Sequence, residues 1–193
     1  PFAGGDGSDS DPYQIENWRH LNNVRDNLTS NFILVNDLDE TTAGYNELVK
    51  DDTGTLVNEG KGWDPIAGSH PYFEGEFDGN DKVIRDLKIN RPDESYVGLF
   101  ANNEGTIKNL GVENLAIIGE SEVGGLAGGN DGSILRSYTS TGNVVATAEN
   151  SNSYIGGLVG EQSGTTPSIS ESYANVEVKG FSESIGGLVG ANS

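Results

Sequence analysis

Apolar residues between positions 96 and 190 recur in short groups separated by glycine. A phrase of the type Val/Ile-Gly-Gly-Leu-x-Gly occurs four times, and the glycine before its leucine is residue 98, 125, 157 or 187. The first copy, Tyr96-Val97-Gly98-Leu99-Phe100-Ala101, has lost one glycine before its leucine and has alanine in place of the last glycine. The intervals of 27, 32 and 30 residues are the period of a solenoid, in which each repeat forms one coil and stacks on the next.

The residues around the phrase keep the same phase. Seven residues after the aligned glycine stands Gly105, Gly132 or Gly164, and an isoleucine, a polar turn and a valine-containing segment follow. One repeat therefore predicts three short strands separated by glycine- or asparagine-containing turns, which fills one coil of a parallel β-helix. We expect an all-β protein, a parallel β-helix (β-solenoid). The repeat positions with a structural role are Gly98, Leu99, Gly105, Gly125, Leu126, Gly132, Gly157, Leu158, Gly164, Gly187 and Leu188.

The first 73 residues do not repeat. Apolar residues at intervals of three or four predict an amphipathic helix over 16–28, followed by a strand at 32–35. We expect residues 1–35 to be an N-terminal cap with a short capping helix, because an open solenoid end exposes backbone and core. Residues 36–73 are predicted as an acidic loop or insertion with one helical turn near 45–49, leading into the first coil. Residues 74–193 are predicted as coils, with further repeats expected beyond Ser193.

The phrase Gly-Gly-Leu-Val-Gly, with the Gly-x-Ile and Ser-Tyr elements that follow it, resembles the GLUG repeat of bacterial and archaeal surface proteins. The resemblance covers about residues 72–193, and its clearest copies lie at 154–160 and 184–190. Large adhesins and non-catalytic parts of surface peptidases belong to that family. The resemblance implies a β-helix, an extracellular or cell-surface setting, and no catalytic residues to carry over.

The strong negative charge of the chain disfavours negatively charged partners. The net charge is −19, from 30 acidic and 11 basic residues, so nucleic acid and anionic membrane surfaces are disfavoured. We expect no membrane insertion, because no long apolar run is visible. The acidity has three open interpretations, namely adaptation to high salt, solubility alone, or specific cation sites.

Calcium is the one cofactor that the acidic residues suggest. Asp6, Asp9 and Asp11 stand within six residues on a glycine- and serine-rich opening, and Ca²⁺ prefers such oxygen ligands. The spacing does not match an EF-hand, and solvated acids are the alternative interpretation. Asp37 and Asp39 form a second, weaker cluster.

Catalysis is not expected. β-Helices can host polysaccharide-cleaving sites, which need carboxylates arranged along one face. None of the candidate acids recurs in register from coil to coil, and no cysteine or His-Glu-x-x-His motif suggests zinc. The candidates are Asp78, Asp81, Asp86, Glu94 and Glu104.

An aromatic group in the insertion leaves a further alternative open. Trp63, Tyr72 and Phe73 lie close in sequence, and they either pack in the core of the first coil or form a sugar-binding platform. We therefore expect a non-catalytic β-helical segment of a large secreted or cell-surface protein, acting as an adhesive or spacing stalk. The alternatives are a carbohydrate-binding or polysaccharide-cleaving β-helix and a subunit of a self-assembling fibre. Its partners would be a glycan or protein surface ligand, or neighbouring copies.

Overall fold

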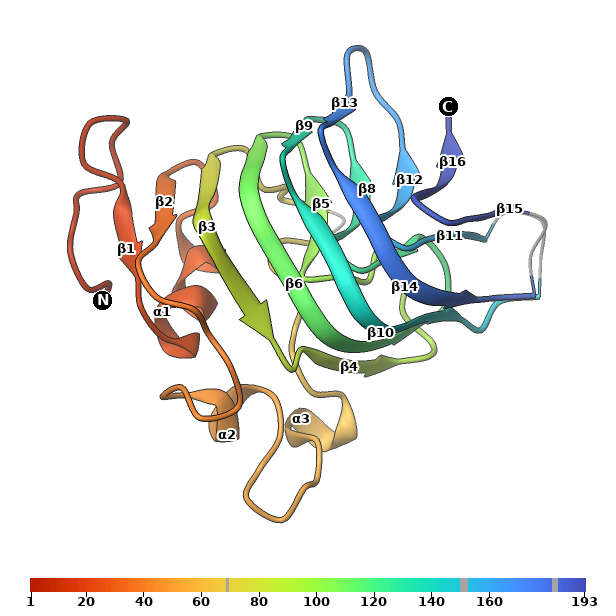
Figure 1. The fold of residues 1–193 in the computed structure, drawn as a ribbon, viewed down its shortest axis with the longest axis horizontal. Helices are drawn as coiled ribbons and strands as arrows, with labels where there is room; N and C mark the ends of the chain where they lie inside the picture. Colours follow the sequence, from red (N-terminus) through yellow and green to blue (C-terminus); the bar gives the residue numbers. More distant parts are fainter. Residues whose placement is uncertain (69, 150–152, 182–183) are drawn as a thin grey trace.

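The fold is a stack of short parallel strands, as a computed structural model of the chain shows for residues 1–68, 70–149, 153–181 and 184–193 (Figure 1). The named strands pair in parallel throughout and form three sheets. This confirms the all-β parallel β-helix predicted from the repeats.

The three sheets are the faces of the solenoid. The largest contains β1 Tyr13–Ile15, β2 Asn31–Leu34, β3 Glu76–Arg85, β4 Lys88–Arg91, β6 Thr106–Gly119, β9 Ser133–Leu135, β10 Tyr138–Ala146, β13 Ser168–Ser170 and β14 Tyr173–Lys179. The second contains β5 Phe100–Asn103, β8 Ala127–Asn130, β12 Val159–Gln162 and β16 Val189–Asn192. The third contains β7 Val123–Gly124, β11 Tyr154–Gly156 and β15 Ser184–Gly186.

Each repeat phrase turns a corner between two faces. In the second copy, β7 lies in the three-stranded sheet and β8 in the four-stranded sheet, with Leu126 between them. Leu99, Leu126 and Leu158 are fully buried and belong to one hydrophobic core. Leu188 is 37% exposed, because β15 and β16 have a neighbouring strand on one side only.

Close backbone approach explains part of the glycine pattern. A Cβ built on Gly132 would lie 2.2 Å from the carbonyl oxygen of Gly105, which is far below any real contact. Its φ is not in the left-handed region, so lack of space rather than backbone conformation requires glycine there. Several left-handed positions carry other residues, since Asn109, Arg136 and Glu171 have φ of 53°, 46° and 49°, although Gly142 and Gly164 are left-handed too.

The N-terminal helix is shorter than the pattern predicts. The structure has α1 Trp18–Asn23 and a 3₁₀ turn η1 Val24–Asp26 in place of a helix over 16–28. The helix begins after Asn17, whose side chain accepts the amide of His20 at 2.9 Å. Ile15 fits the three-to-four-residue spacing of apolar residues but lies in β1. The apolar spacing therefore extends beyond the helix itself and overstates its length.

The parallel ladder starts earlier than residue 74. β1 pairs with β2, and β2 pairs with β3, so the N-terminal segment contributes strands to the solenoid's largest sheet as well as the helix that covers its end (Figure 1). The strand expected at 32–35 is β2. Residues 3 and 4 hydrogen-bond to Gln14 and cover the outer edge of β1.

The insertion forms two short helical turns beside the first coil. The turn expected near 45–49 is α2 Tyr45–Leu48, and a second turn, α3 Val57–Gly60, follows it. Within α3, Asn58, Glu59 and Gly60 all have left-handed backbone, with φ of 54°, 57° and 86°. Left-handed conformation costs about 1–2 kcal/mol for each non-glycine residue, so this turn is held by its surroundings.

Candidate functional site

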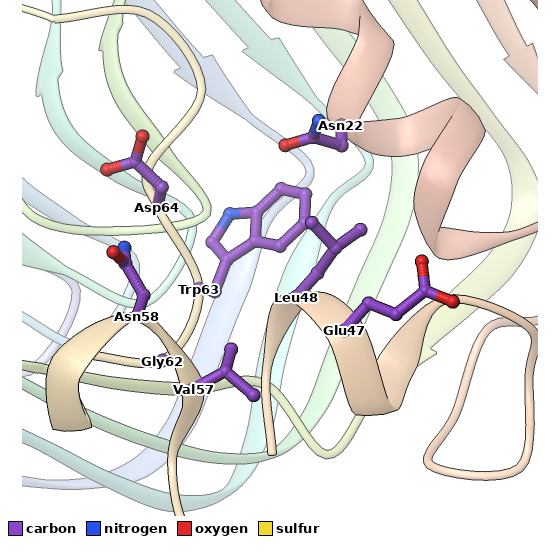
Figure 2. A pocket seen from close by; sticks show the side chains of 8 residues that line it. All are labelled: Asn22, Glu47, Leu48, Val57, Asn58, Gly62, Trp63 and Asp64. Carbon is purple, nitrogen blue, oxygen red and sulfur yellow. The ribbon is translucent and has the colours of Figure 1, made fainter. Parts of the chain in front are cut away.

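A cavity of about 260 Å³ opens where the three helical turns meet the first coil (Figure 2). We call it the helix pocket. Asn22 comes from α1, Glu47 and Leu48 come from α2, and the other walls come from α3 and the segment that follows it. Its lining residues are Asn22, Glu47, Leu48, Val57, Asn58, Gly62, Trp63 and Asp64.

A buried aromatic cluster fixes the helical turns around the pocket. The Trp18 ring meets Tyr45 at 5.4 Å and Trp63 at 5.5 Å, both edge to face. The indole N–H of Trp18 donates to the carbonyl of Asp39 at 2.9 Å, and the Tyr45 hydroxyl donates to the carbonyl of Asp86 at 2.8 Å. These contacts join α1, α2 and the first coil, so the pocket has a rigid floor.

An ion-pair network holds Asp64, which lines the pocket. Asp64 pairs with Arg25 at 3.0 Å and with Arg91 at 2.9 Å. Arg91 also pairs with Glu94 at 2.7 Å, and Glu94 pairs with Lys61 at 2.7 Å. Arg91 is only 6% exposed, so its guanidinium depends on these partners.

The network changes the ionisation of its members. Partial burial raises the pKa of Glu94, but hydrogen bonds from Lys61 and Arg91 outweigh it and leave the pKa below its ordinary value. Burial lowers the pKa of Arg25, partly offset by the charge of Asp64. A second cavity of about 210 Å³, lined by Pro65, Tyr96 and neighbouring residues, shares Asp64 with the helix pocket.

The aromatic residues of the insertion do not form an open platform. Trp63 and Phe73 are fully buried, and the indole N–H of Trp63 donates to the carbonyl of Leu99 at 3.3 Å. The platform interpretation of these two rings is therefore wrong, because their faces pack in the core of the first coil. Tyr72 is half-buried and lies against His70, with ring centroids 4.4 Å apart.

The acidic opening does not gather its carboxylates around one point. Asp6 Oδ1 accepts the amide of Ser8 at 2.9 Å, while Asp9 Oδ1 accepts the side-chain amide of Asn31 at 2.6 Å. Among residues 1–68, 70–149, 153–181 and 184–193, no group of three or more His, Cys, Asp or Glu side chains could hold a metal ion. Asp6, Asp9 and Asp11 are thus not brought together as a calcium site.

The weaker acidic pair is used structurally. Asp37 accepts the amide of Val83 at 3.0 Å and pairs with Arg85 at 3.0 Å. Burial raises the pKa of Asp37, but these hydrogen bonds outweigh it and the pKa is lowered. Asp39 caps its own turn by accepting the amide of Thr41 at 2.8 Å.

The acids considered for catalysis have separate partners. Asp78 accepts the side-chain amide of Asn109 at 2.9 Å, and Asp86 accepts that of Asn114 at 2.5 Å. Glu94 belongs to the network of Arg91 and Lys61 described above. Asp81 is exposed at the irregularity within β3, where its φ is 57°, and Glu104 is exposed between β5 and β6. These partners stabilise neighbouring coils and do not aim two carboxylates at one point.

The sequence patterns did not point to Asn22, Asn58 or Asp64. One signal for the pocket was present in the run Asn58-Glu59-Gly60-Lys61-Gly62, whose asparagine and glycines favour left-handed turns. A Cβ on Gly62, where φ is +72°, would lie 2.4 Å from the carbonyl oxygen of Lys88. The run therefore marks the place where the insertion is pressed against the first coil.

Long apolar helices are absent from the described residues. None of the helices described is long and apolar enough to cross a membrane.

Comparisons with known proteins find partial relatives. No family model matches the chain. A Gly-rich membrane protein of Evansella cellulosilytica is 38% identical over 140 residues, 69% of this chain. Halomucin of Haloquadratum walsbyi is 36% identical over 159 residues, 81% of the chain, and an immunoglobulin A1 protease of Streptococcus pneumoniae is 31% identical over 148 residues, 72% of the chain.

These relatives are far longer than the matched region. The chain spans 15%, 2% and 8% of their respective lengths. A crystal structure of an immunoglobulin A1 protease-like protein from Bacteroides ovatus matches with a TM-score of 0.69 and 24% identity, covering all of this chain and 65% of that one. The chain is therefore similar in sequence to one segment each of a Gly-rich membrane protein, halomucin and an immunoglobulin A1 protease. It shares its fold with the solved structure.

Proposed function

We propose that this chain is a non-catalytic β-helical segment of a large cell-surface or secreted protein, acting as an adhesive or spacing stalk. The observation that carries the proposal is the register of the coils. Val112 pairs with Ile84 on one side and Thr139 on the other, and Thr139 pairs with Ala174, so successive coils add length along one axis. A ladder of this kind extends a protein without needing a larger core.

The relatives support the surface setting. Their names include a membrane protein and an immunoglobulin A1 protease, and the matched segment is a small share of each. We place the repeats in the GLUG group on the strength of the glycine-leucine phrase at 154–160 and 184–190. An extracellular location and a glycan or protein ligand on another surface belong to the same proposal.

The proposal assigns no chemistry to the chain. Its support is that Asp78, Asp86 and Glu94 are each held by neighbouring side chains. Any protease activity of the longer relatives would then belong to other parts of those proteins.

Head-to-tail assembly of copies is the less favoured alternative. The amide of Ala3 donates to the carbonyl of Gln14 at 3.0 Å, and the amide of Gln14 donates to the carbonyl of Gly4 at 2.9 Å. The outer edge of β1 is therefore already occupied, so another copy's edge strand would have to displace this segment. Repulsion between copies of net charge −19 also opposes stacking.

Deleting one coil tests the stalk proposal. Removal of residues 125–156 joins Gly124 to Gly157 and preserves the phrase. We expect the shortened chain to keep its β-sheet circular dichroism and to lose about 4.8 Å of length in small-angle scattering. Both chains should leave polysaccharides and immunoglobulin A1 uncleaved, and measurable turnover by the intact chain would refute the proposal.

A further inference from the structure

We propose that the helix pocket binds a single neutral sugar ring. The inference rests on the proposed function in its adhesive form and names the class of ligand. A cavity of about 260 Å³ is smaller than the roughly 300–1,000 Å³ of pockets for drug-sized molecules, so it suits a ligand of one ring. The pocket lies on the insertion, outside the repeat pattern that builds the coils (Figures 1 and 2).

The charge around the pocket favours a neutral ligand. Glu47 pairs with Arg19, whose Nε donates to Glu47 Oε2 at 2.8 Å, and Asp64 pairs with Arg25 and Arg91. Because each carboxylate is balanced by arginine, a metal cation would meet positive charge beside its ligands. An anion would meet the carboxylates. Hydroxyl groups, which both donate and accept, can use the free lone pairs without bringing charge.

The amides supply donors beside these acceptors. Asn22 and Asn58 lie on opposite sides of the pocket in Figure 2, with Trp63 between them. Asn22 Oδ1 accepts from Arg25 Nε at 3.0 Å, which fixes its orientation, and its N–H₂ group has no acceptor among the residues that the structure describes. The Asn58 side chain forms no hydrogen bond within the described residues and is exposed at the rim. A sugar ring has hydroxyl groups at its edge and CH groups on its faces, so its site needs a polar surface beside an apolar one.

The apolar surface of the helix pocket comes from Leu48 and Val57, and the indole of Trp63 lies beside them (Figure 2). Trp63 itself is fully buried, so the proposed contact with the CH groups of the sugar falls on Leu48 and Val57 rather than on an open indole face. This distinguishes the site from the aromatic platform that the structure excludes.

The left-handed turn gives the strongest reason to assign a function here. Asn58 and Glu59 both occupy a backbone region that costs non-glycine residues energy. The Asn58 carbonyl accepts the amide of Lys61 at 3.0 Å, but its side chain forms no hydrogen bond within the part of the chain that the structure describes. Strained backbone of this kind gathers at ligand sites, where the surrounding fold maintains it. Asparagine tolerates the left-handed region better than most residues, and at this exposed position it also places an amide at the rim of the pocket.

The test is an NMR titration of the intact chain labelled with ¹⁵N. Glucose, galactose, mannose and N-acetylglucosamine are added one at a time, with glucuronate and Ca²⁺ as charged probes. We expect one neutral sugar to shift the side-chain amides of Asn22 and Asn58, with a dissociation constant on the order of 1 mM, because so small a ligand has few contacts. Shifts with glucuronate or Ca²⁺ alone, or with no probe, would overturn the proposal.

Two matched variants locate the binding. Asn58→Gly removes the amide and relaxes the turn, so binding should weaken about tenfold while the fold is kept. Glu59→Gly changes the neighbouring left-handed residue, which does not line the pocket, and should leave affinity unchanged. Equal affinity in Asn58→Gly and the unaltered chain would place the sugar elsewhere and refute the site. The spacing role would survive that outcome, since turnover and coil deletion test it separately.

Discussion

The side-chain amide of Asn103 donates a 2.8 Å hydrogen bond to Oδ1 of Asn130 in the next coil, and both residues are fully buried. They pair in register at the ends of β5 and β8. Asn130 in turn donates to the carbonyl of Gly132 at 3.2 Å. Gln162 and Asn192 continue the row in backbone register, and the Gln162 amide donates to Oδ1 of Asn192 at 3.5 Å.

Replacing Asn130 with alanine should destabilise the chain by about 2 kcal/mol. The change removes the nearest acceptor of the Asn103 amide and leaves it the longer bonds to the carbonyls of Gly105 and Ser133 at 3.4 and 3.5 Å. Weakened pairing of a buried polar group costs about 1–3 kcal/mol. Urea unfolding followed by circular dichroism measures the difference. Asn175→Ala is the control, because Asn175 is exposed on β14 and should change stability by less than about 0.5 kcal/mol. Equal effects of the two substitutions would show that the amide row does not stabilise the stack.

The coils could be predicted from the sequence, but the buried amide row could not. The spacing of glycine and leucine is enough to predict coils, because each coil must repeat its corners to stack. Asn103, Asn130 and Gln162 occupy equivalent positions, but three polar residues at these intervals also fit solvent-exposed turns. Only the closing of the coil buries Asn103 and Asn130, while Gln162 stays half-buried. Burial of polar residues therefore could not be predicted from their spacing.

Alanine at Gly125 should destabilise the chain, whereas alanine at Gly187 should not. The two glycines occupy the same place in the phrase. A Cβ at Gly125 would lie 2.6 Å from the carbonyl oxygen of Gly157 and 2.7 Å from Thr139, whereas a Cβ at Gly187 meets nothing within 4 Å. We expect a loss of about 1–3 kcal/mol for Gly125→Ala and a change within about 0.5 kcal/mol for Gly187→Ala.

Thermal unfolding of the two variants in the same buffer measures this difference. The comparison keeps the substitution and the repeat position constant and varies only the presence of a neighbouring coil. Similar losses in both would mean that the glycine serves backbone flexibility within its own coil. Similar tolerance would mean that the coils can separate locally at little cost.

The helix pocket could not be predicted from sequence for a different reason. Its polar residues come from three separate turns, with Asn22, Asn58 and Asp64 spread over more than 40 residues that do not repeat. The sequence did indicate the helical turn at 45–49, and it left Trp63 open between a platform and the core. Trp63 is buried against Trp18 of α1, whose ring in turn packs against Tyr45 of α2.

Added salt should raise the unfolding temperature. A net charge of −19 spread over 193 residues produces repulsion that unfolding relieves. Salt shortens the Debye length from about 10 Å at 0.1 M to about 3 Å at 1 M, and so weakens this repulsion. Exposed ion pairs such as Arg19 with Glu47 are also weakened, but each contributes little.

Calorimetry in sodium chloride and in potassium chloride checks the expectation. Equal increases of a few degrees with both salts would fit screening, since each kcal/mol shifts the midpoint of a domain of this size by about 2–4 °C. Isomolal sucrose controls for the general effect of solutes. A midpoint that falls with salt would mean that ion pairs such as those of Arg91 outweigh the repulsion.

Neutralising Glu122 should stabilise the chain at neutral pH. Burial raises the pKa of Glu122, and the charge of Glu161 raises it further, while a hydrogen bond with Ser121 lowers it. The folded state therefore binds a proton at Glu122 more readily than the unfolded state does. For a carboxyl group with a raised folded pKa, the penalty is absent at low pH and grows as pH rises through the folded pKa.

Glu122→Gln should consequently gain about 0.5 kcal/mol at pH 7, because the site is only half-buried, and the gain should vanish below about pH 4. Glu59→Gln is the control, since it removes the same charge from an exposed turn. Urea midpoints for both variants at several pH values separate the local effect from the change in net charge. A gain of equal size in Glu59→Gln would assign the stabilisation to net charge, and a gain that persists at pH 3 would contradict ionisation of Glu122 as its cause.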